Sequence, residues 1–184
     1  MSVKRELTDR DVRILYLPPM TIASIHLVGI ESENRTAEVR TGEYINNFIK
    51  ENGLVKIKPD FRHFGFNNPD NIPDEDPKHG YERWISIPED MQLKEPFIKK
   101  NFSGGTFAAH MIPFGLWDEG WMSLYNWLET SGEYEQDYGG SEFNGTCGWL
   151  EEQLNYMNWY DKDNSKVSTL QLDLLLPIKK KNNG

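Results

Sequence analysis

The feature that most constrains the fold is a repeated order of predicted elements. Strand–helix–strand–strand occurs over about residues 12–90 and again over 97–179. The two stretches also share letters, because TIAS at 21–24 is echoed by TFAA at 106–109. A repeated order with matching letters is typical of a duplicated unit. We therefore predict a single domain over residues 1–184, built of two repeats.

Local patterns predict the elements of each unit. Runs rich in β-branched and aromatic residues indicate strands, and apolar residues at helical spacing indicate helices. The predicted strands span 12–28 (interrupted by Pro18-Pro19), 61–67, 80–88, 97–112, 147–157 and 169–178, and the predicted helices span 35–52 and 116–130. Two such units can pair into one sheet. The predicted fold class is α+β: duplicated β-α-β-β units forming one mixed, largely antiparallel sheet, with two helices on one face and a ligand cleft on the other.

Composition excludes several classes of protein. The 184 residues carry a net charge of −9, whereas a nucleic-acid surface needs clustered Lys and Arg. No apolar run approaches the length of a membrane span, and the first residues lack the apolar core of a signal peptide. The single cysteine, Cys147, cannot form an intrachain disulfide, which fits a reducing compartment. We expect a cytoplasmic protein with no nucleic-acid or membrane partner.

Alternation along the strands predicts which side chains share a face. Side chains of a strand point alternately to the two faces of a sheet, and the apolar residues of the last strand should pack against the helices. The simplest assignment then places three acids and two indoles together on the face away from the helices: Glu82, Glu151, Asp173, Trp84 and Trp149. Glu152 is the exception, because its parity places it with leucines. A register shift of one residue would exchange it with Glu151, so the parity leaves open which of the two faces the cleft.

Acids and indoles on one face suggest the kind of ligand. Exposed Trp clusters are rare without a function, and carboxylates do not belong in an ordinary core. A cleft for a hydrophobic cation accounts for both, because carboxylates complement the charge and aromatic faces complement the ring or alkyl body. Along the second helix, one stripe at core spacing contains Trp117, Trp121, Leu124, Tyr125 and Leu128. Within this stripe, Trp121 and Tyr125 are also candidates for the wall of the cleft.

Metal and cofactor motifs are absent from the sequence. The histidines His26, His63, His79 and His110 form no closely spaced ligand pair. Gly104-Gly105 is not followed by the Lys-Ser/Thr of a phosphate-binding loop. We therefore predict no metal and no cofactor.

Five segments in order resemble the GyrI-like effector-binding domain family: LYLPPMTIASIHLVG, GYERWISIPED, FSGGTFAAH, LEEQLNY and LDLLLPIK. The resemblance covers about residues 12–179. It implies a duplicated β-α-β-β fold with a cleft between the halves that binds hydrophobic, often cationic, small molecules. It also implies that a glutamate in the last-but-one strand faces the ligand, and the family pattern selects Glu151. Gln153 stands where the family often has Tyr, which implies a different ligand preference.

The resemblance leaves three functions open. The first is a module that binds aromatic or amphipathic cations, as in the ligand-binding part of bacterial transcription regulators. The second is a hydrolase of reactive small molecules in which Glu151 is the general base. The third is an inhibitory module that binds a protein partner of unknown identity. Because only eleven residues precede the first predicted strand, too few for a helix-turn-helix, the chain resembles the free-standing members of the family.

Overall fold

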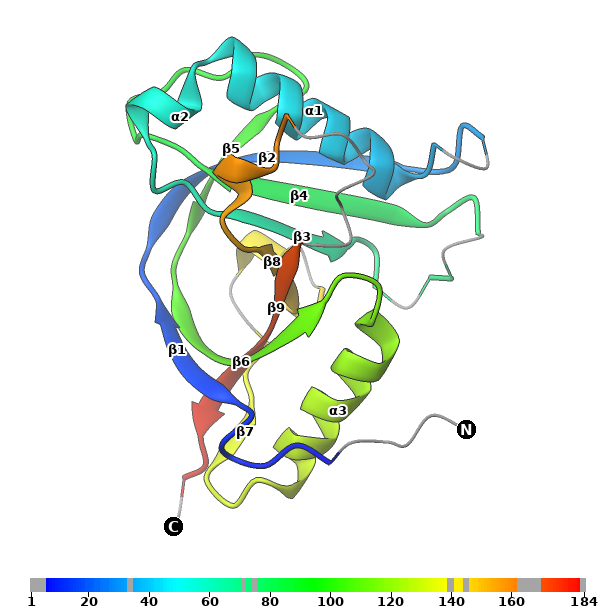
Figure 1. Cartoon of the computed structure of the whole chain (residues 1–184), viewed down its shortest axis with the longest axis vertical. Coiled ribbons are helices and arrows are strands. Elements are labelled where there is room, and N and C mark those ends of the chain that lie inside the picture. Colours follow the sequence, from blue (N-terminus) through cyan, green and yellow to red (C-terminus); the bar gives the residue numbers. More distant parts are fainter. Residues whose placement is uncertain are drawn as a thin grey trace.

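The computed structural model describes residues 6–32, 35–70, 72–73, 76–138, 141–143, 146–161 and 170–182 (Figure 1). In chain order the elements are β1 (Arg13–Leu17), β2 (Met20–Val28), α1 (Ala37–Glu51), α2 (Leu54–Ile57), β3 (His63–Asn67), β4 (Gly80–Ser86), β5 (Ile98–Phe102), β6 (Gly105–Pro113), α3 (Trp117–Thr130), β7 (Tyr134–Gln136), η1 (Ser141–Phe143), β8 (Leu150–Gln153), η2 (Tyr156–Asn158) and β9 (Gln171–Lys180). The predicted fold class is confirmed: the chain is α+β, with one curled antiparallel sheet and two main helices.

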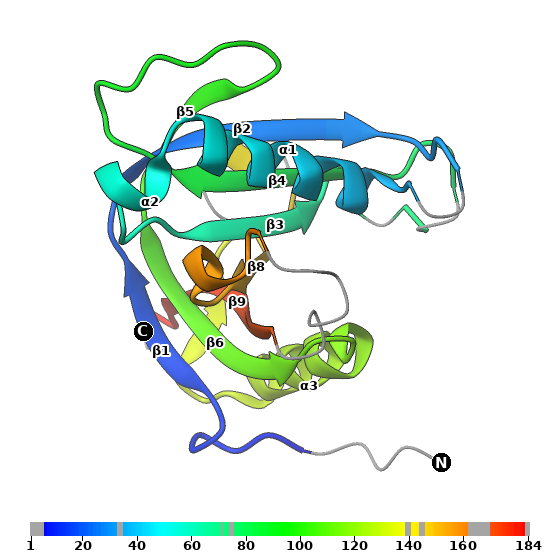
Figure 2. The same cartoon turned by 45° about the horizontal axis from the view of Figure 1, so that its top comes forward.

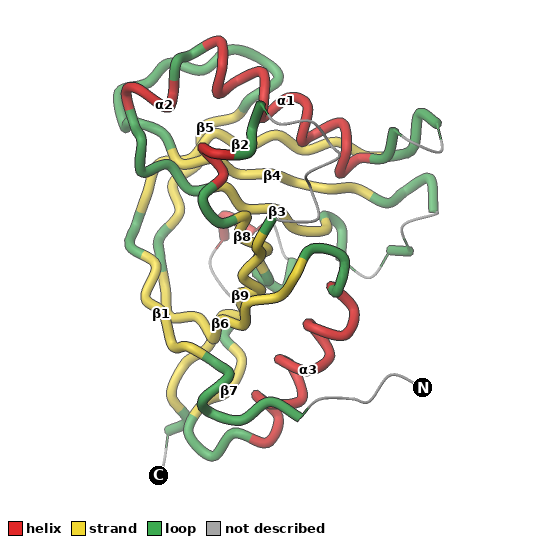
Figure 3. Tube along the Cα trace, in the orientation of Figure 1, coloured by secondary structure: helices red, strands yellow, loops and turns green. Residues whose placement is uncertain are grey.

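The strands pair in the order β1-β6-β9-β8-β3-β4-β2-β5, and β7 adds to the end of β9. All the pairings are antiparallel, so the expected mixed character is not seen among the described strands. The short strands β1 and β5 form the two edges, and each pairs with a strand of the other half of the sequence. Figure 3 shows the resulting sheet curling into a half-barrel. The centre of this sheet is the β3–β8 pair.

Both helices pack on the same face of the sheet. Helix α1 buries Ile45, Phe48 and Ile49 against β2 and β4, where Ile25 and Ile85 lie. Helix α3 buries Leu124 and Leu128 against β6 and β9 in a separate cluster. In Figures 1 and 2 the two helices lie at opposite ends of the curled sheet, with β3 and β8 between them. The helix-bearing face is therefore least covered by helix at the central strands.

The opposite face of the sheet is a closed core. Its side chains pack into one buried cluster, whose members are Leu17, Ile22, Phe64, Phe66, Trp84, Phe102, Phe107, Ala109, Phe143, Leu150 and Leu175. Phe143 of η1 stacks on Trp84, with ring centroids 5.0 Å apart, and so covers this face from outside. The expectation of an open cleft on this face is therefore wrong, because aromatic side chains fill it.

Candidate functional site

Glu151 lies at the centre of the sheet, on the face that carries both helices. In the sheet, Glu151 stands opposite Gly65 of β3 and opposite Leu174 of β9. Leu174 belongs to the core cluster under α3. The side chain is half-buried between the two helices. The phenol of Tyr81 donates a hydrogen bond to one carboxylate oxygen at 2.8 Å, and the indole of Trp121 lies 3.4 Å from the other. Burial raises the pKa of Glu151, and these two donors oppose the rise.

Tyr81 reaches Glu151 only because the residue between them is a glycine. Tyr81 is on β4 and Glu151 is on β8, so the tyrosine must cross β3. It crosses above Gly65, where an added Cβ would lie 2.3 Å from the Tyr81 oxygen. The missing side chain at Gly65 therefore leaves the space in which the phenol of Tyr81, on β4, contacts Glu151 on β8, two strands away.

Aromatic rings flank the acid on the α3 side. Trp121 of α3 stacks on Trp149, which precedes β8, with centroids 5.1 Å apart and planes at 25°. Tyr125, one turn further along α3, lies 5.9 Å from Trp149. Both indoles are half-buried and Tyr125 is 36% exposed, so this group retains contact with solvent. We call Glu151, Tyr81, Trp121, Trp149 and Tyr125 the Glu151 cluster.

A buried arginine lies beneath the cluster. The guanidinium of Arg83 is 4.9 Å from the centre of the Tyr81 ring. Neighbouring His63 is fully buried, and its pKa is lowered well below the usual value by burial and by the Arg83 charge. His63 is therefore neutral at physiological pH and leaves Arg83 as the positive group of this region.

The other two acids expected in the cleft lie on the opposite face. Glu82 is 1% exposed and accepts hydrogen bonds from Ser24, Trp84, Asn68 and Lys100, the last as an ion pair. Burial raises the pKa of Glu82, but the donors, Lys100 first, outweigh burial and lower it. Glu82 is therefore an ionised structural acid with its own cation.

Asp173 shares that face and is likewise neutralised. It is 2% exposed and forms an ion pair with Arg13. Its cross-strand neighbour is Glu152, which takes a bidentate contact from Arg62 at 2.6 and 2.5 Å. The prediction that Glu151 shares a face with Glu82 and Asp173 is therefore wrong, and the acid that does so is Glu152. Of the two glutamates, Glu151 points between the helices.

The two remaining candidates divide between the faces. Trp84 is fully buried in the aromatic core, so it cannot line a solvent-facing cleft with Glu151. Gln153 lies on the same face as Glu151, two residues further along β8, and is half-buried. The alternation of β8 thus places Trp149, Glu151 and Gln153 together, as the sequence indicated. Tyr81 and Arg83 were missed as site residues, although their parity with Ile85 already placed them on the helix-facing side.

Within the described ranges, no group of three or more His, Cys, Asp or Glu side chains could hold a metal ion. None of the described helices is long and apolar enough to cross a membrane.

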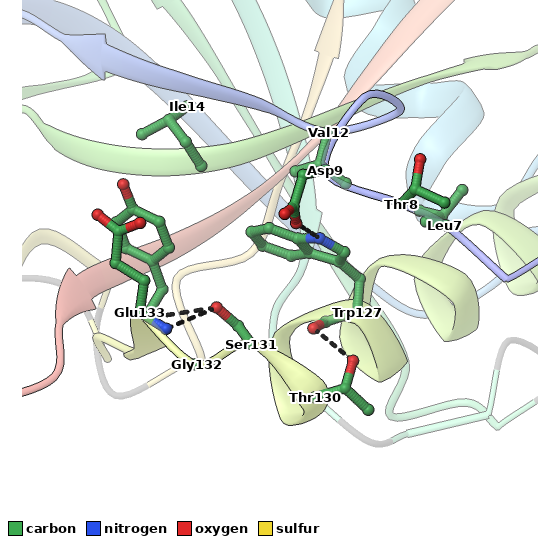
Figure 4. Close-up of a pocket in the computed structure, with 11 residues that line it drawn as sticks. Leu7, Thr8, Asp9, Val12, Ile14, Trp127, Thr130, Ser131, Gly132 and Glu133 are labelled. Carbon is green, nitrogen blue, oxygen red and sulfur yellow. Dashed lines mark hydrogen bonds between the residues drawn. The ribbon is translucent and has the colours of Figure 1, made fainter.

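A cavity of about 620 Å³ lies at the C-terminal end of α3, and none of the predicted site residues lines it (Figure 4). Its walls come from residues 7–14 and from the end of α3 with the turn into β7. Trp127, whose indole donates to Asp9 at 2.9 Å, lies among these lining residues together with Val12. This hollow is separate from the Glu151 cluster, which shares no residue with it.

A curled antiparallel sheet with two helices on either side of a half-buried acid is the architecture expected of an effector-binding domain. The sequence profile of the integron-associated effector binding protein family, Cass2, matches residues 13–178. The chain therefore belongs to this family, and the resemblance to GyrI-like domains is confirmed. Membership of an effector-binding family implies that its ligands are small molecules.

Solved structures share the fold. The EcmrR C-terminal domain is 12% identical with a TM-score of 0.60, over 92% of this chain and 98% of that one. EcmrR in a complex with DNA is 12% identical with a TM-score of 0.64, and the match spans 92% of this chain and 57% of that one. A hydrolase from Listeria innocua is 11% identical with a TM-score of 0.55, over 92% of each chain. No curated protein sequence matches the chain. At these identities the likeness concerns the fold alone.

Proposed function

We propose that the protein binds hydrophobic cations at the Glu151 cluster. The observation that carries the proposal is a difference between the acids of the central sheet. Glu82, Asp173 and Glu152 each have a Lys or Arg within ion-pair distance, whereas no described cation pairs with Glu151. A half-buried carboxylate without a cation is costly, and a bound cation would supply the missing charge.

The aromatic neighbours define the rest of the ligand. The stacked pair of Trp121 and Trp149, with Tyr125 beside it, offers flat apolar surface next to the carboxylate. A cation over an aromatic face gains about 0.5–2 kcal/mol, depending on how far it is desolvated. We therefore expect a delocalised or alkylated cation with an aromatic body, and not a small hydrated ion.

The test compares two dyes of one skeleton. Crystal violet is a cationic triarylmethane, and its leuco form is the neutral counterpart. Titration of each into the purified protein, followed by Trp fluorescence, should show tighter binding of the cation. The isosteric change Glu151→Gln should weaken crystal violet binding at least about tenfold, which corresponds to about 1.4 kcal/mol.

Glu51→Gln is the matched control. Glu51 is an exposed acid at the end of α1, so its replacement changes the net charge equally without touching the cluster. This variant should bind crystal violet like the wild type. Equal affinity of the Glu151→Gln variant and the wild type, or failure of any dye cation to bind, would contradict the proposal.

A hydrolase using Glu151 as general base is the second candidate. Its support is the raised pKa of Glu151, because a carboxylate with raised pKa accepts a proton from water more readily. Incubation with an aryl epoxide, followed by chromatography, should then yield a diol. Turnover abolished by Glu151→Gln with binding retained would decide for the enzyme, and an unchanged epoxide would exclude this substrate class.

A further inference from the structure

Arg83 is a buried cation whose hydrogen-bond partners are all neutral. The residue is 9% exposed. Its guanidinium nitrogens lie 3.2 Å from the Thr41 hydroxyl, 3.2 Å from His63 Nε2 and 3.3 Å from the carbonyl oxygen of Glu38. No carboxylate among the described side chains forms an ion pair with it. Burying a charge without a counter-ion is expensive, so the field of Arg83 must be balanced by a negative group nearby.

Arg83 is linked to an acid, Glu151, through the ring of Tyr81, which contacts both. The guanidinium lies 4.9 Å from the centre of the Tyr81 ring, and the phenol of that ring donates to Glu151 at 2.8 Å. Tyr81 is 4% exposed, and Gly65 leaves its ring a fixed place above β3. Arg83, Tyr81 and Glu151 therefore form a chain of contacts in which a buried ring lies next to both charged groups.

The other ionisable groups around these three residues are few. Glu38 of α1 acts on Glu151 and on Tyr81 and opposes their ionisation. His63 of β3 is neutral. Tyr156 of η2 is hydrogen-bonded to Asn46, and burial raises its pKa, so it also stays uncharged. Arg83 is thus the positive group that favours a charged Glu151.

We propose that Arg83 is a positioning residue of the cation site: anchored to α1 and stacked against Tyr81, it holds the phenol on Glu151 and lets the half-buried carboxylate carry its negative charge at neutral pH. The proposal rests on the cation-binding function, because it explains how that site keeps its charge. Arg83 itself does not contact the ligand. It sets the pH range in which the site is competent.

The first test uses protein without ligand. Glutamate labelled with ¹³C at the carboxyl carbon is titrated by NMR, and the Glu151 signal is assigned by its loss in Glu151→Gln. In Arg83→Met the titration midpoint of Glu151 should rise by about one unit or more, because the opposing positive charge is removed. An unchanged midpoint overturns the proposal. Since no ligand is present, this outcome is independent of whether dyes bind.

The second test follows crystal violet binding as a function of pH. In Arg83→Met, affinity at pH 7 should fall in proportion to the ionised fraction of Glu151, by up to about tenfold for each unit by which the midpoint exceeds 7, and recover as the pH is raised toward 9. A purely structural role would weaken binding equally at every pH, and that result would also overturn the proposal. Arg83→Lys keeps the charge and should keep the midpoint within about half a unit. If Arg83→Met does not fold, the Lys variant decides, and a midpoint more than about one unit above that of the wild type refutes the role of the charge.

Discussion

Replacement of Gly65 by alanine tests the geometry of the site most directly. A Cβ at this position would lie 2.3 Å from the Tyr81 oxygen and 2.7 and 2.8 Å from two of its ring carbons. These distances are far inside van der Waals contact, so the ring must move or the strands must separate. The backbone of Gly65 is not in the left-handed region, so alanine itself is not strained there. The cost of the substitution therefore comes from Tyr81.

The magnitude follows from the two ways of relieving the contact. If the ring stays, the overpacked core costs about 1–3 kcal/mol. If the ring leaves, a hydrogen bond to a charged group worth about 1.5–3 kcal/mol is lost, and the phenol is left without a partner. Because these are alternatives, we expect Gly65→Ala to lower the free energy of unfolding by about 1.5–3 kcal/mol.

A double-mutant cycle separates this explanation from a general intolerance of the strand. In Tyr81→Leu the atoms that meet the new Cβ are gone. Gly65→Ala should then be neutral or stabilising by about 0.4–1 kcal/mol, because alanine restricts the unfolded chain. Urea unfolding followed by circular dichroism measures all four proteins. Equal destabilisation in both backgrounds, or a Gly65→Ala protein as stable as the wild type, would refute the claim that the Tyr81 ring occupies the space above Gly65.

Three further predictions concern the acids and the indole pair. Because burial raises the pKa of Glu151, the folded state keeps this proton to higher pH than the unfolded chain, and stability is lost as the pH rises above 4.5. Glu151→Gln should therefore have a higher urea midpoint than the wild type at pH 7, with the difference shrinking toward pH 4.5; a lower midpoint at pH 7 would contradict this. Lys100→Met leaves the buried Glu82 without its cation and should cost about 3–5 kcal/mol in urea unfolding, and wild-type stability would show that the other donors suffice. Trp149→Phe weakens the stack on Trp121 and should lower crystal violet affinity about threefold to tenfold, by about 0.5–1.5 kcal/mol; unchanged affinity would remove the indole from the site.

Alternation alone predicted the faces of two strands correctly. In β4, the row containing Tyr81 and Ile85 faces α1, and Glu82 with Trp84 faces the closed core. In β9, Leu172, Leu174 and Leu176 face α3, and Asp173 points away from it. Each strand has one row that is mostly apolar, with Arg83 as the exception in β4, and such a row identifies the helix-facing side because that side must be buried. The same reasoning applies wherever one row of a strand is mostly apolar.

Strand β8 lacks such a row, and there the prediction failed. Glu151 alternates with Leu150 and Glu152, so both rows contain an acid. Parity fixed which residues share a face but not which face that is. The decision comes from pairing, because Glu151 stands opposite Gly65 and Leu174 on the helix-bearing side. Those partners are more than twenty residues away on either side, and no local pattern reveals them.

The neutralising cations were equally hidden from the sequence. Arg62 reaches Glu152 across 90 positions and Arg13 reaches Asp173 across 160. A search for acids by strand parity therefore finds ion-paired and unpaired carboxylates alike. The two kinds differ in whether a Lys or Arg lies within ion-pair distance, and that depends on the tertiary structure of the half-barrel.

The distribution of charge over the two faces supports the proposed role of Glu151 in binding a cation. On the closed face an ionised carboxylate can exist only with a partner, because the surrounding aromatic core excludes water, and each acid there has acquired a Lys or Arg. On the helix-bearing face the positive group, Arg83, contacts the Tyr81 ring, and no ion pair between it and Glu151 is seen among the described side chains. The arrangement supports the negative charge of Glu151 without neutralising it by contact, which leaves the carboxylate able to pair with a cation arriving from solvent. A lysine or arginine introduced within reach of Glu151, for example at the adjacent Gln153, should therefore compete with the ligand in the same way that Arg62 occupies Glu152.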